Sequence, residues 1–256
     1  MVHSVAIIGD GAISRRLRGH LASDAAFDVV AVLSRQSSGA LSPDVYAALA
    51  GAETVVEAAG IDAVAEFGPT VIAHGNDFLI SSIGALANQD LRMKLSAGPG
   101  RHFPTIGAIG GLDLLQAASA SGGLENVTLQ TRKLPRALLQ SWMSANEQTQ
   151  LREATAPIRL FNGSPEQAVG KFPASLNVAF ALSLAVGPKV SVEIELLADP
   201  AAVLTEHRIS ASGSAGEYQF LIRNEPDPEQ PRSSGLTARS LYSGLRRLAQ
   251  PNGMFI

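Results

Sequence analysis

The stretch that decides the fold is AIIGDGAISRRLRGHL, residues 6–21. An apolar run ends at Gly9, a second glycine follows two residues later, and a helical pattern begins directly after it. Such a turn is typical of a dinucleotide site, because the first glycine permits the tight turn and the second lets backbone amides approach the pyrophosphate. Ser14 replaces the third glycine of that pattern and is small enough to pack the helix on the strand. A strand–helix turn that binds no ligand is the alternative. The residues expected to contact the cofactor here are Gly9, Gly11, Ala12 and Ile13.

The position that distinguishes NAD from NADP is expected at the end of the second strand, about 20 residues past the third glycine position. The sequence AVLSRQSS places Ser34 and Arg35 there. A carboxylate would accept a hydrogen bond from the ribose hydroxyl of NAD, whereas Ser and Arg can bind the 2′-phosphate of NADP. The sequence therefore favours NADP over NAD, and the alternative is that Arg35 is a solvated loop residue.

Composition excludes several classes of protein. The chain has 256 residues, of which 46% are hydrophobic and 17% charged, a net charge of -3 and no cysteine. Disulfides and thiolate sites are excluded, a nucleic-acid or membrane surface is not indicated, and His, Asp and Glu show no metal-ligand spacing. The first residues enter a strand without the basic segment of a signal peptide, and no apolar run reaches the roughly 20 residues that cross a bilayer. We expect a cytoplasmic protein with a small-molecule partner.

The pattern of apolar runs predicts an α/β protein of two domains. Residues 1–110 alternate buried runs with helices, which indicates a Rossmann-type, doubly wound parallel sheet. Residues 111–233 change to alternating strands and one apolar helix, which indicates a second α+β domain with a mostly antiparallel sheet. A helix within 234–256 is expected to pack back on the first domain. The expected strands are 5–8, 27–33, 54–58, 78–82, 102–106, 127–132, 190–196, 206–211 and 217–223, and the expected helices are 12–23, 42–49, 61–74, 86–95, 112–120, 175–185 and 236–248.

Several stretches, in order along nearly the whole chain, resemble one family. They are SSIGALAN (81–88), GAIGGLDLLQAA (107–118), TRKLPRAL (131–138), KFPASLNVAFALSLA (171–185), EHRISASGSAGEYQF (206–220) and NEPDPEQPRSSGLTA (224–238). With the N-terminal glycines they resemble the L-aspartate dehydrogenase family. The resemblance implies a homodimer that oxidises L-aspartate with NAD or NADP to iminoaspartate, which hydrolyses to oxaloacetate and ammonia and can feed NAD biosynthesis.

The resemblance also implies roles for three residues. His207 corresponds to the catalytic histidine, and Ala108 and Asn177 correspond to contacts on the nicotinamide side. One departure lies next to the histidine: many members have Asn-Arg before it, and this chain has Thr205 and Glu206.

The chemistry of amine oxidation points to residues of the same types. A base must take the ammonium proton, and a histidine suits this role because its unperturbed pKa of about 6.5 lies near neutral pH. An ordinary strand histidine is the alternative for His207. Two substrate carboxylates call for cations, and each candidate could also be a solvated side chain. These candidates are Lys133, the first choice, with Arg136, Lys171 and Arg232.

Two other functions are compatible with these residues. One is a different NADP-dependent oxidoreductase of the same build, acting on a small dicarboxylic or imino compound. The other is a nucleotide-sensing protein that retains the glycine turn without turnover, for which a positioned base would have no use.

Overall fold

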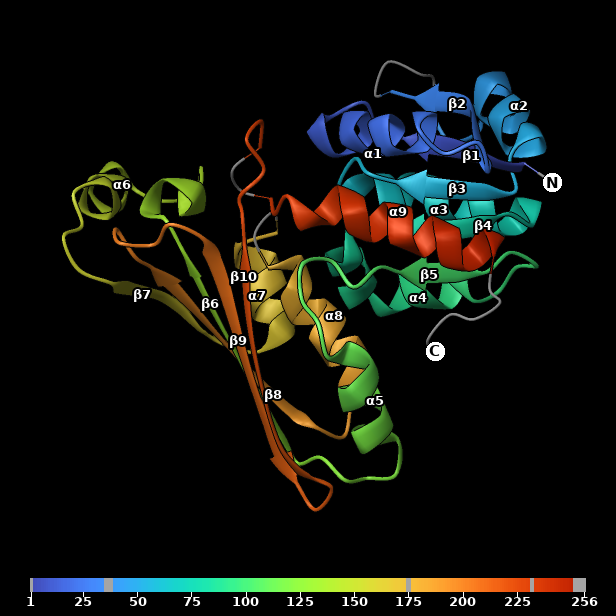
Figure 1. The fold of residues 1–256 in the computed structure, drawn as a ribbon. Coiled ribbons are helices and arrows are strands. Elements are labelled where there is room, and N and C mark those ends of the chain that lie inside the picture. Colours follow the sequence, from blue (N-terminus) through green and yellow to red (C-terminus); the bar gives the residue numbers. More distant parts are fainter. Residues whose placement is uncertain (1, 35–38, 174–175, 231–232, 251–256) are drawn as a thin grey trace. The chain divides into compact units, whose positions relative to one another are not determined.

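The computed structural model describes residues 2–34, 39–173, 176–230 and 233–250, and Figure 1 shows their course. The chain forms two compact units. One contains Met1–Gly107 with Thr237–Ile256, and the other contains Ala108–Leu236.

The first unit is built on a parallel sheet. Its strand order among the described residues is β2-β1-β3-β4-β5, so the chain reverses direction across the sheet between β1 and β3. The carboxyl ends of the strands beside such a reversal are where α/β sheets bind ligands. The strands are β1 (His3–Ile8), β2 (Phe27–Leu33), β3 (Thr54–Glu57), β4 (Asp77–Ile80) and β5 (His102–Pro104).

Helices cover both faces of this sheet. Val5 and Ile7 of β1 form a core with Leu241 and Leu245 of the C-terminal helix. Phe78 of β4 lies on the other face and packs closely on α3. A Cβ added to Gly68 of α3 would lie 3.1 Å from the ring of Phe78. The helices are α1 (Ala12–Ala22), α2 (Pro43–Gly51), α3 (Ile61–His74), α4 (Gln89–Leu95) and α9 (Leu236–Ala249).

The second unit is a mixed sheet with helices on one face. Its strand order among the described residues is β10-β9-β6-β8-β7. β6 and β8 are parallel, whereas β10–β9, β9–β6 and β8–β7 are antiparallel. The strands are β6 (Asn126–Lys133), β7 (Ile158–Gly163), β8 (Ser191–Ala198), β9 (Thr205–Gly213) and β10 (Gly216–Asn224), and the helices are α5 (Leu112–Ala120), α6 (Ala145–Arg152), α7 (Pro165–Lys171) and α8 (Asn177–Val186).

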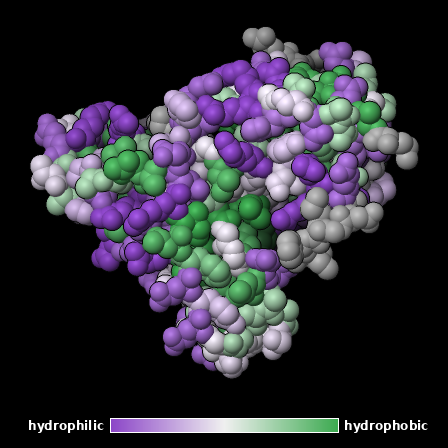
Figure 2. Space-filling view, viewed as in Figure 1, coloured by the Kyte–Doolittle hydropathy of each residue, from purple (hydrophilic) through white to green (hydrophobic). Residues whose placement is uncertain are grey.

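Alternation along the strands separates the two faces of this second sheet. Leu129, Ile194 and Ile209 belong to the core that α5, α7 and α8 cover, and these helices lie along one side of the sheet in Figure 1. The residues between them on the strands face away from that core, as a period of two requires. This opposite face carries charged pairs: Glu206 pairs with Arg223 and Arg208. Hydrophilic side chains gather over β7 and β6 in Figure 2.

The predicted fold class is confirmed, because a parallel α/β unit is joined to a unit with a mostly antiparallel sheet. The helix expected over 86–95 is confirmed from residue 89 to residue 95, but it begins later than predicted. A 3₁₀ helix occupies Ile83–Ala87, and α4 begins only after Asn88, whose side chain accepts a hydrogen bond from the amide of Leu91. Asparagine is favoured at the N-cap of helices, so the sequence contained a signal that a helix starts at Asn88.

Three elements were not predicted at all: α6, β7 and α7. α6 buries only Leu151, and β7 is an edge strand on which Phe161 is the buried side chain. These two segments bury too little surface to show an apolar period. A signal for α6 was nevertheless present, since Ser144 and Glu147 form a reciprocal capping box at its start;.

Among the described residues, no helix combines the length and the apolar character needed to cross a membrane.

Candidate active site

The glycine turn after β1 has the geometry that its sequence predicts. Gly9 has φ +113°, and a Cβ on it would lie 2.7 Å from the carbonyl oxygen of Ala58. Both facts exclude other residues at this position without strain. The turn is fixed further by the amide of Gly9, which donates to the carbonyl of Leu33 over 2.7 Å. The first turn of α1 is therefore held close to β2 and β3 by backbone contacts.

The start of α1 leaves space for a ligand. A Cβ on Gly11 would meet no atom within 4 Å, and the helix begins there without a side-chain cap. The first amides of a helix lack intrahelical acceptors and carry partial positive charge, so this end can hold an anion such as a pyrophosphate. Ala12 and Ile13 are half-buried at the same end, and Ser14 is fully buried against the sheet. These residues fit a dinucleotide.

A buried carboxylate holds the neighbouring loops at the same edge of the sheet. Glu57, the last residue of β3, is fully buried and accepts hydrogen bonds from the amides of Ala59 and Gly60, each over 2.7 Å. It also accepts from the amide and the hydroxyl of Ser82, over 2.8 and 2.9 Å. Burial raises the pKa of this carboxyl, although the hydrogen bonds oppose that shift. Sequence reasoning missed Glu57, and the available signal was a single acid ending an otherwise apolar strand, TVVE.

The ribose position is described only in part. Ser34 directly follows β2 and is half-buried. The predicted partner of the 2′-phosphate, Arg35, lies outside the described residues, as does the candidate cation Arg232.

The second unit brings two candidate side chains together. His207 lies on β9, 2% exposed, and its register partner on β6 is Thr131. Nδ1 of His207 lies 2.9 Å from the hydroxyl oxygen of Thr131. Lys133, 5% exposed, follows two residues later on β6 and therefore faces the same side of the sheet;.

Burial perturbs both titratable groups. It lowers the pKa of Lys133 to about 8. Burial, and next the charge of Lys133, lower the pKa of His207 to about 3. Burying two basic groups close together lowers the stability of the fold. Groups with pKa values shifted in this way cluster at functional sites.

The departure before the histidine lies on the other face of the sheet. Glu206 accepts a hydrogen bond from Nε of Arg223 over 2.8 Å, which is the main reason that its pKa is lowered. Thr205 is buried on the same face as His207;. The glutamate is therefore held by arginines rather than by the candidate base.

The remaining predicted residues lie in different places. Ala108 is buried, and its carbonyl accepts a hydrogen bond from the Asn224 amide over 2.7 Å. Asn177 is the half-buried first residue of α8. Arg136 is exposed in the 3₁₀ turn Pro135–Leu138, which follows Lys133 closely.

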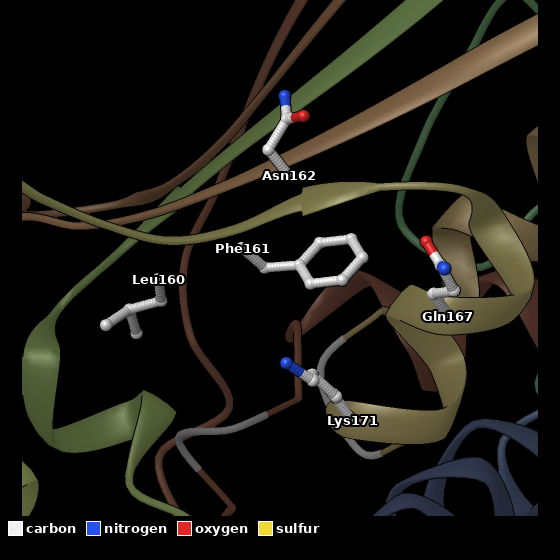
Figure 3. A pocket seen from close by; sticks show the side chains of 5 residues that line it. All are labelled: Leu160, Phe161, Asn162, Gln167 and Lys171. Carbon is white, nitrogen blue, oxygen red and sulfur yellow. The ribbon is translucent and has the colours of Figure 1, made fainter.

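Lys171 lies apart from the histidine. It ends α7 and lines a hollow beside β7, together with Leu160, Phe161, Asn162 and Gln167 (Figure 3). Its Nζ lies 6.0 Å from the ring centre of Trp142. β6 and β8 separate β7 from β9, so the structure brings Lys133, and not Lys171, next to His207. No group of three or more His, Asp and Glu suited to a metal ion occurs in the described part of the chain.

Two family models match the chain, one in each half. The model described as aspartate dehydrogenase, C-terminal, matches residues 113–248. The model described as homoserine dehydrogenase, NAD binding domain, matches residues 9–98. The second match covers the glycine turn, and the first covers the strands that carry Thr131, Lys133 and His207.

Proteins similar over the full length carry one name. The L-aspartate dehydrogenase of Ruegeria pomeroyi is 34% identical, with 95% of this chain and 91% of that protein aligned. The L-aspartate dehydrogenase of Thermotoga maritima is 33% identical, with 96% and 97% aligned. The crystal structure of aspartate dehydrogenase from Thermotoga maritima is similar with a TM-score of 0.75 and 28% identity, covering 100% of this chain and 99% of that one.

Proposed function

The chain belongs to the aspartate dehydrogenase family, and from this premise we propose that it oxidises L-aspartate with NAD(P) as the acceptor. Its enzyme class and its use of a pyridine nucleotide follow from the matched relatives and from the NAD-binding domain. The products of the proposed reaction are iminoaspartate, which water hydrolyses to oxaloacetate and ammonia, and the reduced nucleotide. The reverse reaction, reductive amination of oxaloacetate, uses the same groups.

The observation that carries this proposal is the pair of buried bases on one sheet face. A buried histidine within the field of a buried lysine has no packing purpose that an apolar pair would not serve better. The pair suits a substrate that has both an ammonium group to deprotonate and a carboxylate to neutralise. L-Aspartate is such a substrate.

His207 is the proposed base. Its Nδ1 is engaged with Thr131, so its Nε2 is the nitrogen that takes the proton from the substrate ammonium. The nitrogen lone pair set free then forms the C=N bond while the Cα–H bond breaks and its electron pair leaves as hydride. The oxidised nicotinamide, when bound, supplies the acceptor for that hydride.

Lys133 is the proposed carboxylate partner. A carboxylate beside it compensates the burial of its charge and weakens its repulsion of an imidazolium, so substrate binding raises the pKa of His207 from its low value. The free enzyme thus holds a neutral histidine, and the bound substrate makes it a better base. Arg136, close to Lys133 in sequence, is the next candidate for the second carboxylate. Lys171 and Arg232 remain candidates from the sequence alone.

The nucleotide contacts are proposed from the glycine turn. Gly9, Gly11, Ala12 and Ile13 would hold the pyrophosphate, supported by the open space at Gly11 and the uncapped helix start.

Ser34 and Arg35 would receive the 2′-phosphate, which favours NADP. Ala108 and Asn177 would contact the nicotinamide side, as the family resemblance implies. The homodimer, the cytoplasmic location and a role of the product in NAD biosynthesis, all expected from the sequence, belong to the same proposal.

The test is turnover with a defined set of amines. The purified protein is incubated with L-aspartate or other amino acids and with NAD or NADP, and nucleotide reduction is followed by absorbance. We expect reduction with L-aspartate, faster with NADP. His207→Asn should lower kcat by about 10²- to 10⁴-fold, the range for loss of a general base. His20→Asn, on α1 of the first unit, is the matched control and should keep kcat.

Other results would redirect the assignment. Reduction with a different substrate and none with aspartate would indicate another oxidoreductase of the same build. Tight nucleotide binding without turnover of any amine would indicate a sensor. Near-normal kcat in His207→Asn would contradict the role of the histidine.

A further inference from the structure

We propose that Thr131 is a positioning residue that keeps the proton of neutral His207 on Nδ1, so that Nε2 presents its lone pair to the substrate. This inference rests on the proposed function, because it concerns the nitrogen that acts as the base. Nothing in the sequence motif distinguishes Thr131 from an ordinary strand threonine, a residue type that strands favour.

The contact is held by the sheet itself. Thr131 and His207 are opposite each other in the antiparallel pairing of β6 and β9. β6 is also paired with β8 on its other side, so neither backbone can shift without breaking a ladder. The hydroxyl oxygen and Nδ1 are 2.9 Å apart, and both residues are buried, at 0% and 2% exposed.

The strand on the other side of β9 offers no competing polar group at this register. There β10 places Ile222 opposite His207, and its side chain can neither donate nor accept. On the same strand, Glu206 and Arg208 alternate to the opposite face of the sheet. The hydroxyl of Thr131 is thus the polar group that the two neighbouring strands place opposite the imidazole.

The direction of the hydrogen bond follows from the role of the histidine. A neutral imidazole has one N–H donor and one lone-pair acceptor. If the threonine hydroxyl donated to Nδ1, Nε2 would carry the proton and could not act as a base. When the hydroxyl oxygen accepts from Nδ1–H, Nε2 is free to take a proton, and the resulting imidazolium keeps the same acceptor.

The lysine on the same face makes this tautomer choice important. Burial, and next the charge of Lys133, lower the pKa of His207 in the free enzyme, so the histidine is a neutral ring before substrate binds. A neutral ring works as a base in only one of its two tautomers. The threonine selects that tautomer before substrate arrives, in the way that outer partners fix the tautomer of a metal-bound histidine.

Two substitutions separate the hydroxyl from the shape of the side chain. Thr131→Val keeps the β-branched volume and removes the oxygen, whereas Thr131→Ser keeps the oxygen and removes a methyl group. We expect Thr131→Val to lower kcat by about tenfold to hundredfold, the range for outer partners of catalytic groups, with little change in KM for aspartate. Thr131→Ser should recover most of kcat. An unchanged kcat in Thr131→Val, or a Thr131→Ser variant as slow as Thr131→Val, would overturn the proposal.

A spectroscopic measurement tests the tautomer without turnover. In protein labelled with nitrogen-15 at histidine, the imidazole shifts report which nitrogen carries the proton, and comparison with His207→Asn assigns the signals of His207. We expect the Nδ1–H form in the native protein and a shift toward the Nε2–H form in Thr131→Val. An Nε2–H form in the native protein would refute the proposal.

The role of His207 as the base and the role of Thr131 in positioning it can fail separately. If His207→Asn retains turnover, the proposed role of the base fails, whatever the tautomer. If His207→Asn is inactive but Thr131→Val retains both kcat and the native tautomer, the base role stands and the positioning role fails. Unchanged nucleotide affinity in every variant shows that the first unit remains folded.

Discussion

The candidate site of the first unit consists mainly of backbone groups, whereas that of the second unit consists of side chains. In the first unit the site consists of backbone: a glycine turn, an uncapped helix start and loops held by one buried carboxylate, Glu57. In the second unit it consists of three buried side chains on two strands, Thr131, Lys133 and His207. The glycine turn of the first site is local in sequence, within residues 9–13, whereas 76 positions separate the threonine from the histidine of the second site.

The difference has an energetic side. The first amides of any helix lack an intrahelical acceptor, so a phosphate site made of them lowers the stability of the fold little. A buried lysine and a buried histidine must be removed from water, which costs stability. We therefore expect replacement of the buried lysine in the second unit to improve stability while it impairs activity, and replacement of Glu57 in the first unit to impair both.

After the loss of the proposed base in His207→Asn, the largest expected effect is that of Lys133→Met. Methionine keeps the length of the side chain and removes the buried charge. The lowering of the lysine pKa from 10.5 to about 8 corresponds to about 3 kcal/mol, so the variant should be more stable at pH 7 by up to about that amount. Its KM for aspartate should rise by about 100-fold, as expected when about 3 kcal/mol of carboxylate binding is lost.

Lys133 should also make the stability of the native protein depend on pH. Between pH 8 and 10.5 the unfolded lysine binds a proton that the folded one releases, so native stability should rise with pH across that window;. Lys133→Met should lack this rise in urea unfolding. Lys189→Met, which replaces an exposed lysine, is the matched control and should behave as the native protein. A destabilised Lys133→Met variant would show that the lysine is structural.

Removal of Glu57 is expected to lower both stability and nucleotide binding. Glu57→Ala leaves the amides of Ala59, Gly60 and Ser82 without their acceptor, and each unsatisfied buried group costs about 1–3 kcal/mol. We expect a loss of about 3 kcal/mol in thermal or urea unfolding, together with weaker nucleotide binding. Glu57→Gln should lose less, because one oxygen keeps its donors.

The carboxyl of Glu57 also predicts a pH trend. Since burial raises its pKa above 4.5, the folded state holds the proton more firmly, and this group should make native stability fall as pH rises from about 4.5. Glu57→Gln should lack that contribution. Equal stability of Glu57→Ala and the native protein would show that the hydrogen bonds of Glu57 do not stabilise the loops.

The same contrast explains what the sequence could predict. Gly9 and Gly11 could be identified because strand, turn and helix follow one another in the chain. His207 and Lys133 could be named as residue types, but their common face depends on the register of β6 with β9, which a single sequence does not encode in any local pattern. Thr131 was overlooked for the same reason.

Glu57 was missed for a different reason. An acid at the end of a strand is usually exposed, and only the folded loops show that its donors surround it. α6 and β7 were missed because a polar helix and an edge strand bury too little surface to show an apolar period;.

The smallest expected effects concern the two glycines of the turn. We expect Gly9 to be needed for folding and Gly11 to be needed for ligand binding. Gly9→Ala places a Cβ 2.7 Å from the Ala58 oxygen at φ +113°, which should cost about 1–3 kcal/mol of stability. Gly11→Ala adds a Cβ in open space, so stability should change by less than about 0.5 kcal/mol.

If that open space is occupied by the pyrophosphate, Gly11→Ala should nevertheless weaken nucleotide binding by about tenfold, equivalent to about 1.4 kcal/mol. Titration of nucleotide fluorescence against both variants measures this. A Cβ on Gly11 meets no protein atom, so it can weaken binding only by contacting the ligand itself. Unchanged nucleotide affinity in Gly11→Ala would therefore show that the phosphates bind elsewhere, and the proposed site at this helix start would lose its main support.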